Sequence, residues 1–251
     1  MLSAFCYYRT SVRAPEIAGA PCACRQINVT LHDVTIERML VRIQFGYHMA
    51  RKPKQQRSKA TVDAIVQATM MAIAEHGPAA LTARQIAEIA GIGVGSLYEY
   101  FEDKDAIIHA ASIRFVEDTV GMIKPLVPEL VQLDIRDAIK MLLFRFREFL
   151  EENNQLYLKC ARHAFSMDMV IYQEPINRAL MDFFTQYLMH HPELLRLPNI
   201  PTVAYFYING GVFTVVRHLC EDEPMQSFEE LAEVFGDVLA SYTEHKLATV
   251  K

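Results

Sequence analysis

The segment 82–104, TARQIAEIAGIGVGSLYEYFEDK, contains two short helix patterns joined by a tight turn. Thr82 followed three residues later by Gln85 is the sequence of a capping box, which predicts that the first helix begins here. Gly91 stands where many helices end in a left-handed residue. One apolar stripe runs between these signals, with a small residue where a second helix must cross closely; it consists of Ile86, Ala87 and Ala90. The pattern predicts a helix-turn-helix unit.

The second helix of this unit has an apolar face and a face of different character. The residues predicted to point inward are Val94, Leu97 and Phe101. The residues left facing outward are Gly95, Ser96, Tyr98 and Tyr100. This outer face is small at the front and carries aromatic hydroxyls behind. Because the major groove of DNA is wide enough to admit a helix, the segment is predicted to be a DNA-reading surface.

The same residues resemble the signature of the TetR family of bacterial transcriptional regulators. In that family an LT-x-x-x-I-A-x-x-A-G turn leads into a G-x-x-Y-x-Y/H-F recognition helix and then a lysine. The matching residues here are Leu81, Thr82, Ile86, Ala87, Ala90, Gly91, Gly95, Tyr98, Tyr100, Phe101 and Lys104. The resemblance is specific over about 59–108 and architectural beyond it. Gly93 replaces the family's usual Ser cap, at a cost of a few tenths of a kcal/mol.

The rest of the chain is predicted to be helical, because no segment alternates convincingly at period two. We expect helices over 59–76, 135–152, 155–165, 202–220 and 227–246. A further helix should run from Asp103 towards Gly121 and be followed by a break at Pro125 and Pro128. Another should have Pro175 in its first turn and end at His190. With the resemblance, this predicts an all-α fold. A three-helix helix-turn-helix DNA-binding domain (49–104) would precede a helical effector-binding and dimerisation domain (105–251).

Charge is distributed unevenly along a chain whose net charge is −5. Seven Lys and Arg face six Asp and Glu over 49–104, whereas thirteen face twenty-one over 105–251. This distribution fits a small DNA-binding head on a body that DNA does not touch. No apolar run is long enough to predict a membrane span. Five scattered cysteines indicate reduced thiols, so we expect a cytoplasmic, nucleoid-associated protein.

The first 48 residues follow no apolar period and are interrupted by Pro15, Gly19 and Pro21. They lack the apolar core of a signal peptide after a basic start. We expect translation to begin at Met49, since MARKPKQQRSK is a typical basic entry to such a head. The alternative is a genuine, poorly ordered extension.

Position and chemistry assign DNA-contacting roles within the head. Thr82 at a helix N-terminus suits a phosphate. Arg84, in the first turn, suits a guanine edge or a phosphate. The residues expected to face base edges are Val94, Gly95 and Ser96. The residues that match backbone clamps in the family are Tyr98, Tyr100 and Lys104. The alternative is that the tyrosines only pack and Arg84 is a solvated charge.

In the family, the body binds a small molecule and the resulting tilt of the paired heads releases DNA. The middle helices here are rich in aromatic residues and Met, which suits an apolar effector. The candidate effector residues are Phe144, Arg147, His163, Met167, Tyr172, Phe184 and Asn209. The alternative is that these residues form only core. The resemblance therefore predicts a repressor released by a small apolar effector; an adaptor or activator controlled by a protein partner is the alternative.

The last two predicted helices have the features of a dimer interface. A seam of large apolar groups recurs on the final helix at Phe228, Leu231, Phe235, Val238 and Tyr242. Gly210 and Gly211 in the preceding helix predict a close backbone approach. The alternative from the residues alone is that these two helices pack only within one chain. The resemblance implies a homodimer formed by these helices, which would bind an operator with inverted half-sites. No catalytic motif, cofactor loop or metal-ligand spacing is present in the sequence, so no enzyme, cofactor or metal is predicted.

Overall fold

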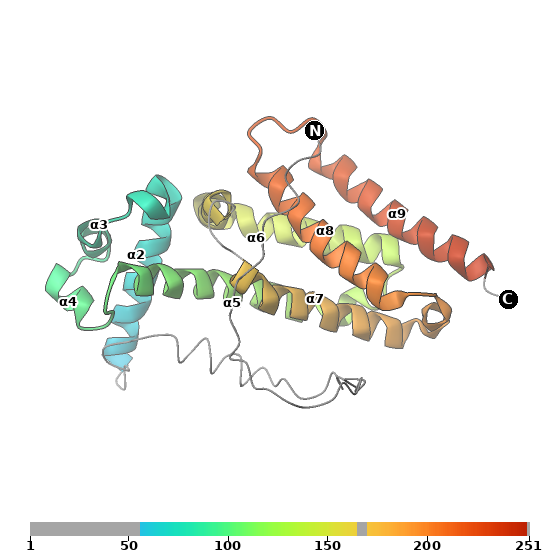
Figure 1. Cartoon of the computed structure of the whole chain (residues 1–251), viewed down its shortest axis with the longest axis horizontal. Coiled ribbons are helices and arrows are strands. Elements are labelled where there is room, and N and C mark those ends of the chain that lie inside the picture. Colours follow the sequence, from blue (N-terminus) through green and yellow to red (C-terminus); the bar gives the residue numbers. More distant parts are fainter. Residues whose placement is uncertain (1–55, 165–169, 250–251) are drawn as a thin grey trace, which may run out of the picture. The chain divides into compact units, whose positions relative to one another are not determined.

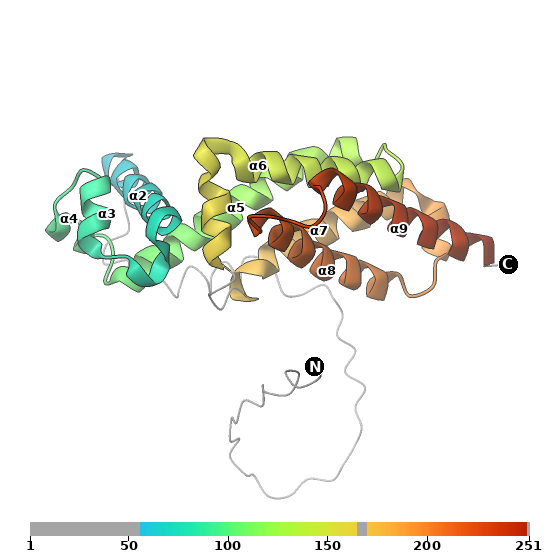
Figure 2. The same cartoon turned by 90° about the horizontal axis from the view of Figure 1, so that it is seen from above.

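The computed structural model describes residues 56–164 and 170–249, which form helices joined by short turns (Figures 1 and 2). No strand occurs among these residues, which confirms the predicted all-α class. All the described helices belong to one unit of the chain, Tyr47–Lys251. The expected N-terminal extension lies outside the described residues.

Three helices and the start of a fourth form the head. They are α2 (Gln56–Ala80), α3 (Ala83–Ile89) and α4 (Val94–Tyr98). The regular part of α2 ends at Gly77, whose backbone angles are φ 73° and ψ 161°, and Pro78 follows. This confirms the predicted stop. The core that joins the helices of the head includes Ile65, Leu81, Ile86, Leu97, Phe101 and Ile107, each at most 2% exposed.

The fourth helix, α5 (Lys104–Leu130), leads from the head into the body. Its predicted cap is confirmed, because the Asp103 carboxylate accepts a hydrogen bond of 2.7 Å from the Ala106 amide. At a rise of 1.5 Å per residue, 27 residues span about 40 Å. The N-terminal half of α5 packs into the head core and its C-terminal half into the body core.

The predicted break at Pro125 and Pro128 is wrong, because α5 continues through both prolines to Leu130. Each proline removes one backbone donor, which leaves the carbonyls of Gly121 and Lys124 without their usual partners. Both prolines, Gly121 and Lys124 are exposed, so water can bond to these carbonyls. Burial of the opposite face, which carries Ile123 and Val127 among others, holds the helix together.

The body contains four further α-helices and one 3₁₀ turn. They are α6 (Ile135–Ala164), α7 (Val170–His190), η1 (Pro192–Arg196), α8 (Ile200–Cys220) and α9 (Phe228–Thr249). These bounds confirm the expected helices near 202–220 and 227–246. The sequence analysis missed η1. Pro175 is the sixth residue of α7 and lies beyond its first turn, so the helix begins earlier than predicted.

Helix α6 consists of two helical parts, as predicted. Glu152 is extended, and Asn153, Asn154 and Gln155 then have left-handed backbone angles, with φ between 52° and 60°. Asn is one of the few residues other than glycine that adopts this conformation readily. The turn directs the second part of α6 against the head core, where Leu156, Tyr157 and Cys160 pack.

Helix α9 lies along α6, and a line of ion pairs follows their contact (Figure 2). Lys140 pairs with Glu233 at 2.6 Å, and Arg147 pairs with Glu229 at 2.8 Å. Each pair is partly exposed and contributes little alone. The two helices approach closely at Gly236, where a Cβ would lie 3.0 Å from the Arg136 carbonyl oxygen. Small size at this position therefore sets the distance between the two helices.

The predicted close approach at the paired glycines of α8 is confirmed for one of them. A Cβ at Gly211 would lie 2.8 Å from the Cζ atom of Phe235 in α9. At Gly210 a Cβ would meet nothing within 4 Å. Gly211 therefore accommodates the Phe235 ring, whereas Gly210 faces open space.

The bend at Gly77 should be sensitive to substitution. Its backbone conformation belongs essentially to glycine, and an added Cβ would lie 3.1 Å from the Nδ1 atom of His163. We expect Gly77→Ala to lower the free energy of unfolding by about 1–3 kcal/mol. Chemical denaturation of the purified protein measures this change.

Gly121→Ala is the matched control, because Gly121 is exposed within α5 and a Cβ there meets nothing within 4 Å. This substitution should raise the free energy of unfolding by about 0.5–1 kcal/mol. Equal effects of the two substitutions would contradict the assignment of strain to Gly77.

Candidate nucleic-acid interface and ligand cavity

The start of α3 has the predicted capping box. The Thr82 hydroxyl oxygen accepts a hydrogen bond of 3.3 Å from the Gln85 amide, and the Thr82 amide donates to the Gln85 side-chain oxygen at 2.9 Å. These two bonds satisfy donors that a helix start otherwise leaves free. Thr82 is exposed, so the start of α3 faces solvent.

The turn between α3 and α4 also agrees with the sequence analysis. Gly91 has φ 67°, the predicted left-handed conformation. The Ile92 amide donates to the Ala87 carbonyl at 3.0 Å, which closes the end of α3. Gly93 caps α4 without a side-chain hydrogen bond, as expected from the absence of a Ser there. The turn therefore fixes the angle between the two helices with backbone bonds alone.

Helix α4 presents a clear outer face. Leu97 is fully buried, whereas Tyr98 is 46% exposed and Val94 is 39% exposed. Gly95 is also exposed, and Ser96 is half-buried. The prediction that Val94 points inward is wrong. It is the first residue of a five-residue helix, where the head core does not reach it.

Three further predicted residues surround this outer face. Arg84 is exposed in the first turn of α3, Tyr100 is half-buried after α4, and Lys104 is half-buried as the first residue of α5. Tyr100 also packs against the head core, so it combines a buried edge with an accessible one. The head thus brings the predicted DNA-contacting residues to α3, α4 and the start of α5.

Acidic residues outnumber basic ones in the part of the head whose side chains are described. Over 58–104 the Lys and Arg residues are Lys59, Arg84 and Lys104, against six Asp and Glu. Within 49–57 there are four more basic residues, Arg51, Lys52, Lys54 and Arg57, and no acidic ones. The basic charge of the N-terminal module is therefore concentrated in its first residues.

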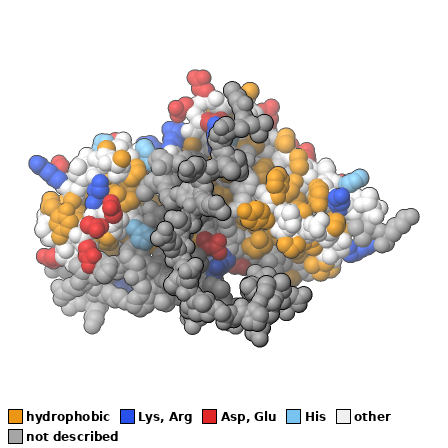
Figure 3. All heavy atoms as spheres, viewed as in Figure 1, with side chains coloured by type: hydrophobic (Ala, Val, Ile, Leu, Met, Phe, Trp, Pro, Cys, Tyr) orange, Lys and Arg blue, Asp and Glu red, His pale blue; other side chains and the backbone are white. Residues whose placement is uncertain are grey.

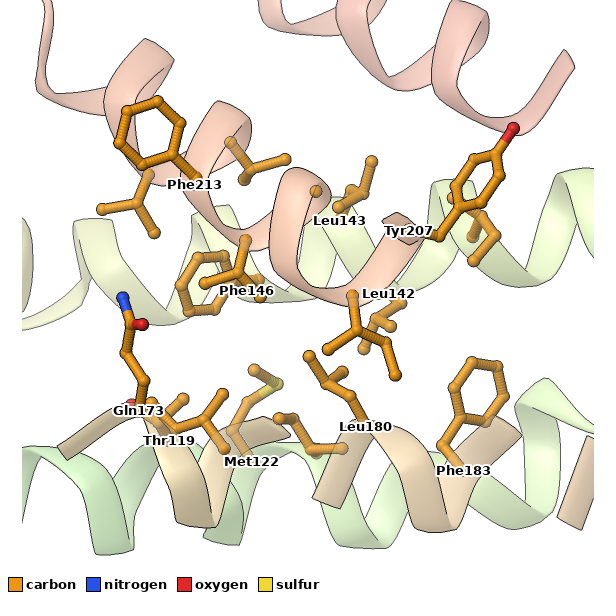
Figure 4. Close-up of a pocket in the computed structure, with 18 of the residues that line it drawn as sticks. Thr119, Met122, Leu142, Leu143, Phe146, Gln173, Leu180, Phe183, Tyr207 and Phe213 are labelled. Carbon is orange, nitrogen blue, oxygen red and sulfur yellow. The ribbon is translucent and has the colours of Figure 1, made fainter. Parts of the chain in front are cut away.

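A cavity lies among α5, α6, α7, α8 and α9 (Figure 4). The cavity has a volume of about 180 Å³, taken as the space that the centre of a water-sized sphere can reach. An engineered apolar cavity of about 150 Å³ in another protein holds benzene, so this space is large enough for a small ligand. The walls are almost wholly apolar and include Met122, Leu142, Phe146, Leu180, Phe184 and Tyr207.

The polar groups of the cavity are few. None of its described lining residues carries a charge. The Thr119 hydroxyl donates to the Phe115 carbonyl within α5 at 2.8 Å. Gln173 is exposed and lies at the same end as Phe213, while Phe183 and Tyr207 lie at the opposite end (Figure 4). The sequence did not indicate that Thr119, Gln173 or Tyr207 would line a cavity.

Phe184 is the candidate effector residue that the structure places in this cavity wall. Phe144 instead packs edge-on against Phe228 of α9, with ring centres 5.7 Å apart. Arg147 lies over both rings and pairs with Glu229. Phe144 and Arg147 therefore do not line the cavity, contrary to the prediction from the sequence. They share a face of α6 directed at α9, whereas a different face of the helix lines the cavity.

Two other candidates also lie away from the cavity. The His163 ring packs against Gly77 in the head. The Asn209 side-chain oxygen accepts from Asn177 at 3.3 Å, and its amide donates to the Tyr205 carbonyl at 2.9 Å. Both polar groups of the Asn209 side chain are therefore hydrogen-bonded, and the bond to Asn177 joins α7 and α8. Met167 and the side chain of Tyr172 lie outside the described residues.

Metal-ligating and thiol side chains are scattered over the described part of the chain. Its His, Cys, Asp and Glu residues form no group of three able to hold a metal ion. Burial raises the pKa of both described thiols, that of Cys160 to about 12. Burial therefore favours the protonated thiol at both positions. None of the described helices combines the length and apolarity that crossing a membrane requires.

The exposed α4, backed by a buried three-helix core, defines a helix-turn-helix protein of the DNA-binding class. The model of bacterial regulatory proteins of the tetR family matches residues 65–111. An HTH-type transcriptional regulator of Staphylococcus aureus is 28% identical over 142 residues, which cover 54% of this chain and 74% of that protein. These likenesses place the helix-turn-helix part of the chain, residues 65–111, in the TetR family of transcriptional regulators.

Two further comparisons agree with this assignment. The HTH-type transcriptional repressor KstR2 of Rhodococcus jostii is 28% identical over 107 residues, which cover 41% of this chain and 52% of KstR2. The crystal structure of a TetR-family regulator from Mesorhizobium loti superposes with a TM-score of 0.58 at 16% identity, covering 76% of this chain and 98% of that one. That structural likeness shows the shared fold, including the helical body.

Proposed function

We propose that the protein is a repressor that binds operator DNA through α3 and α4 and releases it when a small apolar molecule fills the cavity. The observation that carries the proposal is the exposure of Val94 and Tyr98 on a helix whose other face is buried. Contact with a base edge or a sugar removes this exposed apolar and aromatic surface from water, which costs no free energy. One relative with a matching segment is named a repressor.

In this proposal the residues of the head divide the contacts with DNA. Val94, Gly95 and Ser96 face the base edges, and Val94 offers apolar contact to a thymine methyl group. Arg84 reads a guanine edge or binds a phosphate. The residues proposed to contact the backbone are Thr82, Tyr98, Tyr100 and Lys104. Backbone contacts position the head, while base contacts select the sequence.

The proposed division places a DNA-binding domain at 49–104 and an effector-binding and dimerisation domain at 105–251. Helix α5 connects them, since Ile107 lies in the head core and Ile123 lines the cavity. Two polar contacts add to this connection. Arg114 of α5 pairs with Asp63 of α2 at 2.8 Å, and the Tyr157 hydroxyl of α6 donates to Asp118 of α5 at 2.6 Å. A ligand that shifts α5 would therefore shift the head.

We propose that α8 and α9 pair with the same helices of a second copy. Large side chains are exposed on both helices: Tyr205, Phe206, Phe213, Val234 and Val238 are 52–69% exposed. Figure 3 shows hydrophobic side chains gathered over α8. Contiguous exposed apolar surface of this kind marks an interaction site. The predicted seam on α9 is divided, because Phe228 packs inward against Phe144 while Val238 faces solvent.

Substitution of Phe206 tests this interface. Phe206 is 69% exposed on α8, so Phe206→Glu should leave the fold intact. A buried, unpaired charge would oppose pairing, and we expect the dimer to dissociate in sedimentation velocity. Met189→Glu is the matched control, because Met189 is 73% exposed on α7. A monomeric wild-type protein, or a dimeric Phe206→Glu variant, would contradict the proposal.

Substitutions of Arg84 and Lys104 test DNA recognition. Arg84→Ala should weaken binding to the preferred duplex by about 1–3 kcal/mol and leave binding to random duplexes nearly unchanged. Lys104→Ala should weaken binding to both and reduce the slope of log affinity against log salt by about one. Fluorescence anisotropy with both duplexes at several salt concentrations measures these effects.

Lys124→Ala provides the control for Lys104, since Lys124 is exposed in the part of α5 that packs in the body. It should change neither the affinity nor the salt slope. Equal losses on preferred and random duplexes for Arg84→Ala would remove its role in sequence reading. An unchanged salt slope for Lys104→Ala would remove its phosphate contact.

A further inference from the structure

A second, smaller cavity continues the first one along the body. It has a volume of about 20 Å³ and lies between the start of α6, the end of α7, η1, α8 and α9. Phe184 and Leu239 line both cavities. These two side chains therefore form the partition between them.

The order of lining residues along α7 shows that the cavities lie end to end. Gln173, Ile176 and Leu180 line the large cavity, Phe184 lines both, and Leu188 lines the small one. Helix α8, running in the other direction, gives the same order from Val216 through Ala204 to Ile200. At 1.5 Å per residue along α7, the large cavity extends about 16 Å and the small one adds about 6 Å.

Among the described residues that line the end beyond the partition, both side-chain hydroxyls already donate hydrogen bonds within the protein. The Tyr187 hydroxyl donates to the Leu133 carbonyl at 3.0 Å, and the Thr243 hydroxyl donates to the Ala240 carbonyl at 2.7 Å. Burial also raises the pKa of Tyr187, so its hydroxyl stays protonated. This end suits a hydrocarbon terminus.

The opposite end carries the exposed amide of Gln173 (Figure 4). An amide can donate to and accept from a neutral polar group. No charged residue is among those described in the cavity wall, so a carboxylate inside would lose its hydration without gaining a partner. The described cavity wall therefore offers no charged partner to a ligand, and an uncharged ligand with one polar end needs none.

We propose that the effector is a neutral, single-chain aliphatic molecule whose polar end lies at Gln173 and whose methyl end meets Phe184 and Leu239. Phe184 then determines the longest chain that fits. This inference rests on the proposed function, because it assumes that the large cavity is the effector site. Phe184 is a specificity-determining residue in this account.

The partition predicts how affinity depends on chain length. Each methylene buried in the large cavity should raise affinity about fourfold. Once the chain reaches Phe184, a further methylene gains nothing because it has no space to occupy. Phe184→Ala joins the two cavities, so the increase should continue over several more methylenes.

This dependence is measured by isothermal titration calorimetry of the full chain. The ligands are decanol, dodecanol and tetradecanol, with longer and shorter members of the same alkanol series. The variants are Phe184→Ala and Leu188→Ala. Leu188 lines only the small cavity, so its truncation enlarges that space without removing the partition. Circular dichroism and thermal unfolding establish that both variants fold.

The wild type and Leu188→Ala should reach the same limiting chain length, and Phe184→Ala should reach a longer one. An identical limit in all three proteins would overturn the role of Phe184. Binding of compact aromatic compounds but of no alkanol would overturn the ligand class while leaving the effector cavity intact. If neither kind of compound binds a folded wild-type protein, the proposed effector function itself fails.

Discussion

The packing of one helix into two separate cores is the constraint on which the rest of the structure depends. Ile107, Ile108 and Ala111 of α5 lie in the head core, while Ile123, Val127 and Leu130 of the same helix lie in the body core. Because α5 is continuous from Lys104 to Leu130, it joins the two cores directly. The part of α5 that lines the cavity runs from Phe115 to Ile123, so it follows the first set and overlaps the second at Ile123. In the proposed function, a ligand in the cavity would act on the position of α4 through this one helix.

The contact of α6 with the head gives this link a second component. Tyr157 stacks on Phe149 with ring centres 4.7 Å apart and donates its hydroxyl to Asp118. Cys160 donates to the Met70 carbonyl of α2 at 3.4 Å. The second part of α6 therefore holds α2 and α5 together beside the head. A change in the angle between α5 and α6 would have to break or shift these contacts. The contacts therefore oppose movement of the head.

Sequence alone could predict the features that local chemistry determines. The capping box at Thr82, the left-handed Gly91 and the Asp103 cap each depend on residues within a few positions, and all three are present. The outer face of α4 followed from the burial of Leu97. Features that depend on tertiary packing were harder to predict. Pro125 and Pro128 signal a break locally, but burial of the opposite face of α5 overrides that signal.

The cavity shows the same limit more clearly. Phe144 and Phe146 have equal hydrophobicity and lie two positions apart on α6, yet one packs against Phe228 and the other lines the cavity. Their difference arises from the rotation of α6 against α9, which the sequence does not display. Arg147 suits a ligand-orienting role by its chemistry, but its partner is Glu229. The aromatic-rich composition indicated an apolar interior without identifying its lining residues.

The proposed function depends most on α4, which is proposed to read base pairs in a symmetric pair of heads. Selection of bound duplexes from a random pool by the purified protein, followed by footprinting of the selected sequence, tests this most directly. The account predicts two inverted half-sites on one face of the duplex, separated by about one helical turn or a multiple of it. Recovery of no preferred sequence at moderate salt, or of a single undivided site, would contradict it.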